Sequence, residues 1–167
     1  MKAGFIASLA GALFLAASCA TPYGETGYSG GYESNWLAPD VLSVDVSGNG
    51  FTSDQRVKDY ALLQAAERGQ QAGYKYFTML RNDNQGGVDT YYTPPTATTT
   101  TTANAHGNSL YATSNTTTTG GVQQVYKPGR AMVVRMHREV PEGYLPGQYF
   151  AIDEILSTIG VKYLPKK

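Results

Sequence analysis

A Thr-rich segment, residues 96–121, sets the strongest limit on how this chain can fold. Two Thr runs, residues 98–102 and 116–119, flank a short centre at Gly107-Asn108. Thr favours strands, and Gly-Asn suits a tight turn, so the near symmetry of the runs favours a long β-hairpin. A flexible low-complexity loop is the alternative. Either form buries little, so a hydrophobic core has to come from the rest of the chain.

Alternation of apolar and polar residues predicts the first strand of that core. Leu42, Val44 and Val46 fall on one face of residues 41–47, and Gly48-Asn49-Gly50 then breaks the pattern. Two further segments rich in strand formers are residues 74–80 and 131–138.

A long helix is expected from Asp54 to about Ala72, with an apolar stripe rich in Ala that suits close packing on a sheet. Thr52 or Ser53 opens it, and Thr52-Ser53-Asp54-Gln55 fits a capping box in which Gln55 reaches back to the cap. Gly73 is a good terminating residue.

Shorter elements complete the expected order. Residues 88–92 suggest a strand stopped by Pro94-Pro95, and residues 122–126 a return to the sheet. Ile152 to Ile159 predicts a closing helix that stops at Gly160. The fold class is therefore α+β: one small domain over residues 36–167, with a largely antiparallel sheet, one long helix, a short C-terminal helix and a Thr-rich insertion at 94–121.

The N-terminal residues resemble a bacterial lipoprotein signal. A positive Lys2 precedes an apolar stretch over residues 3–15, which is too short to span a membrane, and Ala17-Ser18-Cys19 follows. We expect residues 1–18 to be a signal peptide and Cys19 to carry the lipid, palmitate included. The alternative is an ordinary secretory signal cut after Ala17 or Ala20.

Residues 19–35, rich in Gly, Tyr, Ser and Thr, predict a flexible tether. Ala20, rather than Asp, follows the Cys, which favours the outer membrane with the domain facing the periplasm. The expected partners are the membrane, through lipidated Cys19, and an envelope protein or glycan.

Charge and rare residues narrow the function classes. Lys+Arg and Asp+Glu are both 13, so the chain lacks the basic excess of nucleic-acid-binding proteins. One Cys excludes an internal disulfide, and two His argue against a zinc site. We expect no metal, no cofactor and no catalytic residue, and hence no enzyme.

Alternative functions rest on a few residues. Asp59, Tyr60 and His137 would be the candidate group of a periplasmic hydrolase or ligand-binding enzyme, although a satisfied charge on the helix surface explains Asp59 more simply. Other sequence features offer weaker alternatives. Gly48-x-Gly50 before a helix suggests a phosphate-binding turn, but the third Gly of that motif is missing. A mild basic cluster comprises Lys127, Arg130, Arg135, His137 and Arg138. It would meet lipid phosphates, although a solvated strand face explains it more simply. The Thr-rich segment would also suit a surface adhesin.

The pattern GNGFTSxxRVxDYALLxAAE, from Gly48 to Glu67, resembles that of small lipoproteins of unknown function from alphaproteobacteria and their relatives. The lipobox and the C-terminal strand and helix are similar more loosely. The resemblance implies a location and a fold type, and it brings no activity and no catalytic residues. The leading hypothesis is therefore a membrane-anchored envelope lipoprotein acting as a non-catalytic interaction module.

Overall fold

The structure is a computed structural model that describes residues 19–164, so the expected signal peptide lies outside the described residues. The elements, in chain order, are β1 (Gly31–Ala38), β2 (Val41–Ser47), α2 (Asp54–Gln71), β3 (Tyr76–Asn84), β4 (Gly87–His106), β5 (Ser109–Lys127), β6 (Gly129–His137), β7 (Tyr149–Ala151), α3 (Ile152–Ile155), the π-helical η2 (Leu156–Gly160) and α4 (Val161–Tyr163).

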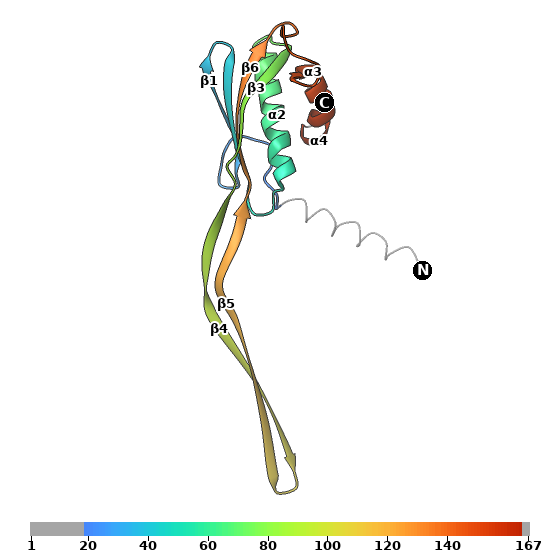
Figure 1. Ribbon diagram of the computed structural model, residues 1–167. Coiled ribbons are helices and arrows are strands. Elements are labelled where there is room, and N and C mark those ends of the chain that lie inside the picture. The colour runs from blue at the N-terminus through green and yellow to red at the C-terminus, as the bar shows by residue number, and fades with distance from the viewer. Residues whose placement is uncertain (1–18, 165–167) are drawn as a thin grey trace, which may run out of the picture. The chain divides into compact units, whose positions relative to one another are not determined.

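Two sheets are present among the described residues. Strands β1, β2, β6, β3 and β7 form, in that order, a five-stranded sheet in which each neighbouring pair is antiparallel. Helix α2 packs along one face of this sheet, and the short C-terminal helices contact α2 (Figure 1). Strands β4 and β5 form a separate two-stranded sheet. The predicted α+β class, with one long helix and a short C-terminal helical segment, is confirmed.

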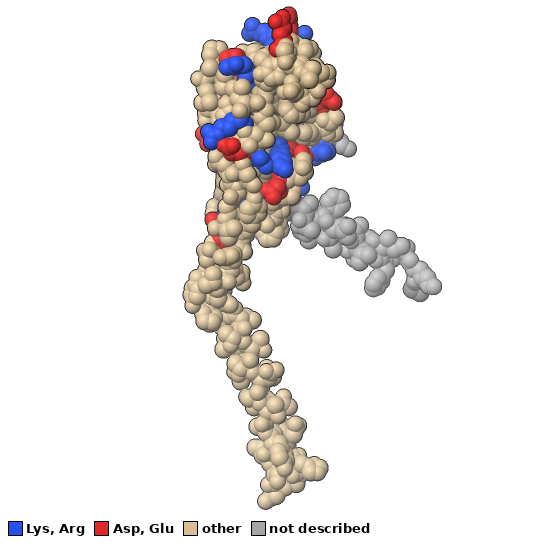
Figure 2. All heavy atoms as spheres, in the orientation of Figure 1, with Lys and Arg blue, Asp and Glu red and all other residues tan. Residues whose placement is uncertain are grey.

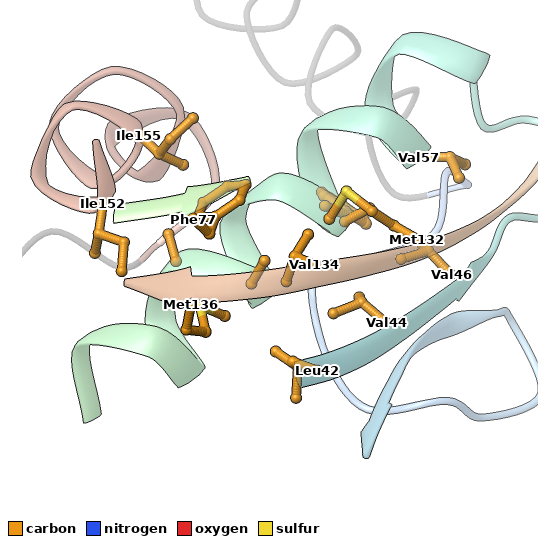
Figure 3. Close-up of a cluster of buried hydrophobic side chains, with 14 residues drawn as sticks. Leu42, Val44, Val46, Val57, Phe77, Met132, Val134, Met136, Ile152 and Ile155 are labelled. Carbon is orange, nitrogen blue, oxygen red and sulfur yellow. The ribbon is translucent and has the colours of Figure 1, made fainter. Parts of the chain in front are cut away.

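The core lies between α2 and the five-stranded sheet. The predicted strand alternation is confirmed, because Leu42, Val44 and Val46 are buried under the helix together with Met132 and the other inward residues of β6 (Figure 3). On α2 the buried side chains include small ones at positions 61, 65 and 66, which let the helix approach the sheet closely.

The predicted ends of α2 are right, but the predicted capping box is wrong. Ser53 is the N-cap, and its hydroxyl accepts a hydrogen bond from the N–H of Arg56 at 3.2 Å. Gln55 instead donates to Asp59, and Thr52 points into the domain. At the other end the N–H of Gly73 bonds to Gln70, and the φ of +78° at Gly73 takes the chain out of the helix.

The expected flexible tether over residues 19–35 is not what the structure shows. Thr21 is fully buried, and Gly31–Ala38 pairs with β2 as the edge strand β1. Tyr32, Ser34 and Trp36 stand opposite the three core residues of β2 and therefore share their face. The sequence did not indicate this strand, because its alternating residues lie in a segment rich in Gly, Ser and Thr.

The Thr-rich insertion is a hairpin and not a loop, and it is longer than expected. Gly107 makes the turn with φ +63°, and a compact unit spans Val88–Val125. Two strand predictions were wrong. Strand β4 runs through Pro94-Pro95, opposite a distortion at Gly120 and Gly121, both with positive φ. Residues 122–126 belong to β5 and do not return to the five-stranded sheet.

The closing helix also extends beyond its predicted stop. Gly160 is buried within a helical segment that continues to Tyr163. A Cβ at Gly160 would lie 3.3 Å from Leu164 Cδ1 and 3.6 Å from Leu63 Cδ1. Gly160 therefore does not end the helix, and the tightest contact of an added Cβ would be with Leu164.

Candidate functional site

Cys19 lies exposed at the start of the described residues, and the chain is fixed immediately after it. The Asn49 side chain donates to the Cys19 carbonyl at 2.8 Å. Two residues on, Thr21 donates its N–H to Thr52 Oγ1 at 2.9 Å and its hydroxyl to Ser29 O at 2.6 Å. The proposed lipid-bearing residue is thus held against the domain by the turn before α2.

Phe51, in the same turn, exposes its ring. Asn49 links it to Cys19, because Asn49 Oδ1 accepts from the N–H of Phe51 at 3.0 Å while its Nδ2 bonds to Cys19. The Phe51 side chain is 75% exposed. The turn that sequence reasoning treated as a possible phosphate loop is instead explained by helix capping at Ser53 and by the tight packing of Gly48, where a Cβ would lie 2.9 Å from Pro128 Cγ.

Contacts among four tyrosines attach the N-terminal segment and the C-terminal helical segment to α2. Ring centroids lie 4.7 Å apart for Tyr23 and Tyr32, 5.1 Å for Tyr23 and Tyr60, and 4.9 Å for Tyr60 and Tyr163. Tyr60 donates its hydroxyl to Thr21 O at 2.9 Å. No sequence pattern pointed to this cluster, because its members come from three segments that are far apart in the sequence.

The electrostatics of this cluster keep its hydroxyls protonated. Burial raises the pKa of Tyr23 well above its ordinary value, and the hydrogen bond to Glu67 and the charge of that residue raise it further. Burial also raises the pKa of Tyr60, and raises the pKa of Tyr163, whose hydroxyl donates to Asp59 at 2.9 Å. Tyr23, Tyr60 and Tyr163 therefore keep their protons and donate hydrogen bonds that join the N-terminal segment, α2 and the C-terminal helical segment.

The structure does not bring Asp59, Tyr60 and His137 into one site. Asp59 is buried, not at the helix surface as expected, and it accepts from Gln55 at 2.7 Å and from Tyr163. His137 shares a hydrogen bond with Thr78 at 3.0 Å, and burial lowers the pKa of His137. Met136, next to His137, packs at Gly69 of α2, ten residues or about 15 Å along the axis from Asp59.

The predicted basic cluster is divided between two faces of β6. Arg130 stands opposite Val46 on the helix side, whereas Arg135 stands opposite Val41 on the other side. Arg135 pairs with Asp40 at 3.4 Å, and Arg138 lies over the ring of Tyr74, with 5.3 Å from Cζ to its centroid. These cations therefore do not form one lipid-phosphate surface.

A polar cavity of about 400 Å³ opens beside β1. Glu25 and Glu33 line it together with Gln64 and Arg68 of α2. Arg68 Nε is buried there without a hydrogen-bond partner. The mixture of acids, an amide and a guanidinium suits hydrogen bonding to a polar group. The sequence did not indicate this cavity, because most of its lining residues come from the expected tether.

The hairpin forms a site of another kind, taken by itself. Both of its strands are exposed almost throughout, and each has a free edge. Cross-strand side-chain bonds join Thr99 to Thr116 at 2.9 Å and Thr101 to Ser114 at 2.6 Å. From Thr90 to Tyr126 the chain carries no Lys, Arg, Asp or Glu, so the ribbon presents an uncharged surface (Figure 2).

Within residues 19–164, no group of three or more His, Cys, Asp and Glu side chains is placed to hold a metal ion. No helix within the same residues is long and apolar enough to cross a membrane.

Comparisons with known proteins give no match: no family model, no curated protein and no solved structure is similar to this chain. The resemblance to small alphaproteobacterial lipoproteins therefore stays a prediction from the sequence motif.

Proposed function

We propose that this chain is a bacterial envelope lipoprotein, anchored through Cys19 in the outer membrane and facing the periplasm, and that its domain is a non-catalytic interaction module. The observation that carries the proposal is the position of Cys19. It follows a short apolar segment in the sequence, it is exposed, and the ordered domain begins two residues after it. Its sulfur is therefore accessible to acylation without any unfolding of the domain.

Such an anchor would hold the domain against the bilayer surface. Each buried CH₂ contributes about 0.8 kcal/mol, so two or more acyl chains give durable attachment. Because the segment after Cys19 is packed and not a free tether, the turn carrying Asn49 and Phe51 would lie at the interface. An exposed Phe ring in that position would enter the boundary between the head groups and the acyl chains.

Metabolic labelling tests the anchor. Cells expressing the full chain are fed an alkyne-palmitate, and the wild type is compared with Cys19→Ala and the near-isosteric Cys19→Ser. We expect label and membrane retention in the wild type and loss of both in each variant. An unlabelled, soluble and processed wild type would contradict the proposal and indicate an ordinary secretory signal.

We further propose that the hairpin captures an extended segment of an envelope protein by strand addition. Support comes from the outer edges of the β4–β5 ribbon, beside which the described residues place no third strand, and from the absence of charged residues between Thr90 and Tyr126. Natural edge strands use charges to block such pairing. Main-chain hydrogen bonds would supply affinity, and the alternating Thr side chains would supply contact surface.

Photocrosslinking in intact cells tests this capture. A photoreactive residue placed at Leu110, exposed in the hairpin, should give a protein adduct, whereas the same residue at Gln70, exposed on α2, should not. An adduct of equal yield at both positions, or none at Leu110, would contradict the proposal. An adduct that resists protease would point to a glycan partner instead.

A further inference from the structure

A second cavity, of about 200 Å³, lies between α2 and the five-stranded sheet. Its apolar wall comes from Ala61 and Leu62 on the helix and from Met79, Met132 and Phe150 on three strands. The Phe150 ring is stacked on the buried Phe77, with 5.2 Å between centroids, so this wall is anchored in the core. Lys58, Asn82 and Arg130 supply the remaining polar groups.

An irregularity in β3 aims Asn82 into this cavity. Met79 pairs with Val134 and Arg81 with Val133, so the register shifts by one residue at Leu80. Without that shift, Arg81 would stand opposite Met132 on the helix side. With it, Asn82 takes this place and Arg81 turns to the other face. Bulges of this kind re-aim side chains and are frequent beside functional sites.

Arg130 is incompletely satisfied where it lines the cavity. Its Nη1 donates to Asn82 Oδ1 at 3.1 Å, which leaves the Asn82 amide N–H groups free to donate elsewhere. Its Nε is buried and has no hydrogen-bond partner. A buried guanidinium N–H without an acceptor is costly, so an acceptor supplied by a ligand would be favoured there.

Lys58 adds a second positive charge at the same cavity, and no acid lines it. The acids nearest to Lys58 along α2 are engaged elsewhere. Asp54 accepts from the hydroxyl of Tyr126 at 3.1 Å, and Asp59 accepts from Gln55 and Tyr163. The cavity thus combines an apolar wall with two cations and one amide donor.

We propose that this cavity binds a small anionic amphiphile, with the head group on Lys58, Arg130 and Asn82 and the first carbons of its chain against Met79 and Met132. Because the volume is below the range of about 300–1,000 Å³ typical of drug-sized ligands, only a short chain or the end of a longer one enters. An alkyl carboxylate and an alkyl phosphate share this chemistry. The binding is independent of the Cys19 anchor.

Ligand-observed NMR on the full chain in lipid nanodiscs, with empty nanodiscs as the blank, tests the site. The probes are hexanoate and hexyl phosphate, with 1-hexanol lacking the charge and inorganic phosphate lacking the chain. We expect at least one of the two amphiphiles to bind about tenfold more tightly than both controls, and the preference between them identifies the head group.

Three variants and a matched control locate the binding. Arg130→Gln and Lys58→Gln should each weaken it about tenfold, and Asn82→Asp should do so by placing a negative charge at the head group while keeping the shape. Arg135→Gln, on the opposite face of the same strand, should leave it unchanged. An affinity that stays unchanged in all three variants would overturn the proposal, and so would inorganic phosphate that binds as tightly as the amphiphiles. Asn82→Asp keeps the test decisive if Arg130→Gln fails to fold.

Discussion

The domain and the hairpin of this protein are stabilised in different ways. In the domain, Leu42, Phe77 and their neighbours are removed from water between a helix and a sheet. In the hairpin, Val88–Val125, the side chains remain in solvent, and order depends on strand propensity and cross-strand pairs such as Thr99 with Thr116. One chain thus combines a domain built on a hydrophobic core with a ribbon that has no core of its own.

The energies of the two regions differ accordingly. Burying a large apolar side chain contributes about 1.5–3 kcal/mol, whereas a cross-strand pair contributes about 0.2–1 kcal/mol. A two-stranded ribbon alone is marginally stable in water. Backbone groups along its edges would gain hydrogen bonds from a further strand, and this supports the proposal that the hairpin binds a partner.

The largest expected contrast comes from removing a large side chain in each region. Phe77→Ala should lower the free energy of unfolding by about 3–5 kcal/mol, because it leaves a cavity in the core. Leu110→Ala, at a side chain 72% exposed in the hairpin, should change it by less than about 0.5 kcal/mol. Urea unfolding followed by the fluorescence of Trp36, the sole Trp, measures both. Equal losses of unfolding free energy in the two variants would contradict the proposed difference between the domain and the hairpin.

The next largest contrast is expected between Ala substitutions at two glycines with positive φ. At Gly30, with φ +92°, an added Cβ would lie 2.4 Å from the Ser47 carbonyl oxygen, so Gly30→Ala should cost about 3 kcal/mol from backbone strain and overpacking. At Gly107 the φ is +63° and no atom lies within 4 Å, so Gly107→Ala should cost only about 1 kcal/mol. Thermal unfolding compares the two variants, and a reversed order would contradict the packing of the N-terminal segment.

A buried threonine and an exposed one give a smaller contrast. Thr21→Val should destabilise the domain by about 1–3 kcal/mol, because the bond to Ser29 O is lost and the Asn49 N–H loses its acceptor. Thr99→Val, in the hairpin, should cost less than about 0.5 kcal/mol. Denaturant midpoints of the two variants decide this, and a stable Thr21→Val would favour a free tether after Cys19.

The smallest effect concerns alkaline pH. The pKa of Tyr23 is raised in the folded domain above the ordinary value of 10.0, so the unfolded chain loses its proton first. Stability should therefore be constant below about pH 10, as far as this group is concerned, and fall as the pH rises beyond it. Denaturant midpoints between pH 8 and 11 would show the fall, with a shallower slope in Tyr23→Phe. Tyr28→Phe, at an exposed ring, controls for the loss of one phenol, and a flat profile would contradict the burial of Tyr23.

Local patterns in the sequence were sufficient for much of the domain. Strand β2 alternates cleanly and α2 has its own start and stop residues, so both were predicted with nearly the observed ends. Strand β1 was missed because Tyr32 and Trp36 face the core only once the segment pairs with β2. The hairpin was underestimated because Pro94-Pro95 ends an inner strand but is tolerated in a two-stranded ribbon.

The candidate sites also differ in whether neighbouring residues in the sequence are enough to predict them. The Cys19 prediction needed only adjacent residues. The cavity at Arg130 could not be predicted, since it depends on a register shift at Leu80 and on residues of one helix and three strands that are far apart in the sequence. The proposed grouping of Asp59, Tyr60 and His137 failed for a related reason, because proximity in sequence or chemistry does not fix proximity in space.

Deleting residues 96–121 from the full chain tests the central claim most directly. The domain should keep its circular dichroism spectrum and its urea midpoint, while the partner identified through the Leu110 adduct should no longer co-purify with the deletion variant after formaldehyde crosslinking of intact cells. A deletion variant that unfolds would show that the domain is not self-sufficient, and a folded variant that still captures its partner would remove the assigned role of the hairpin.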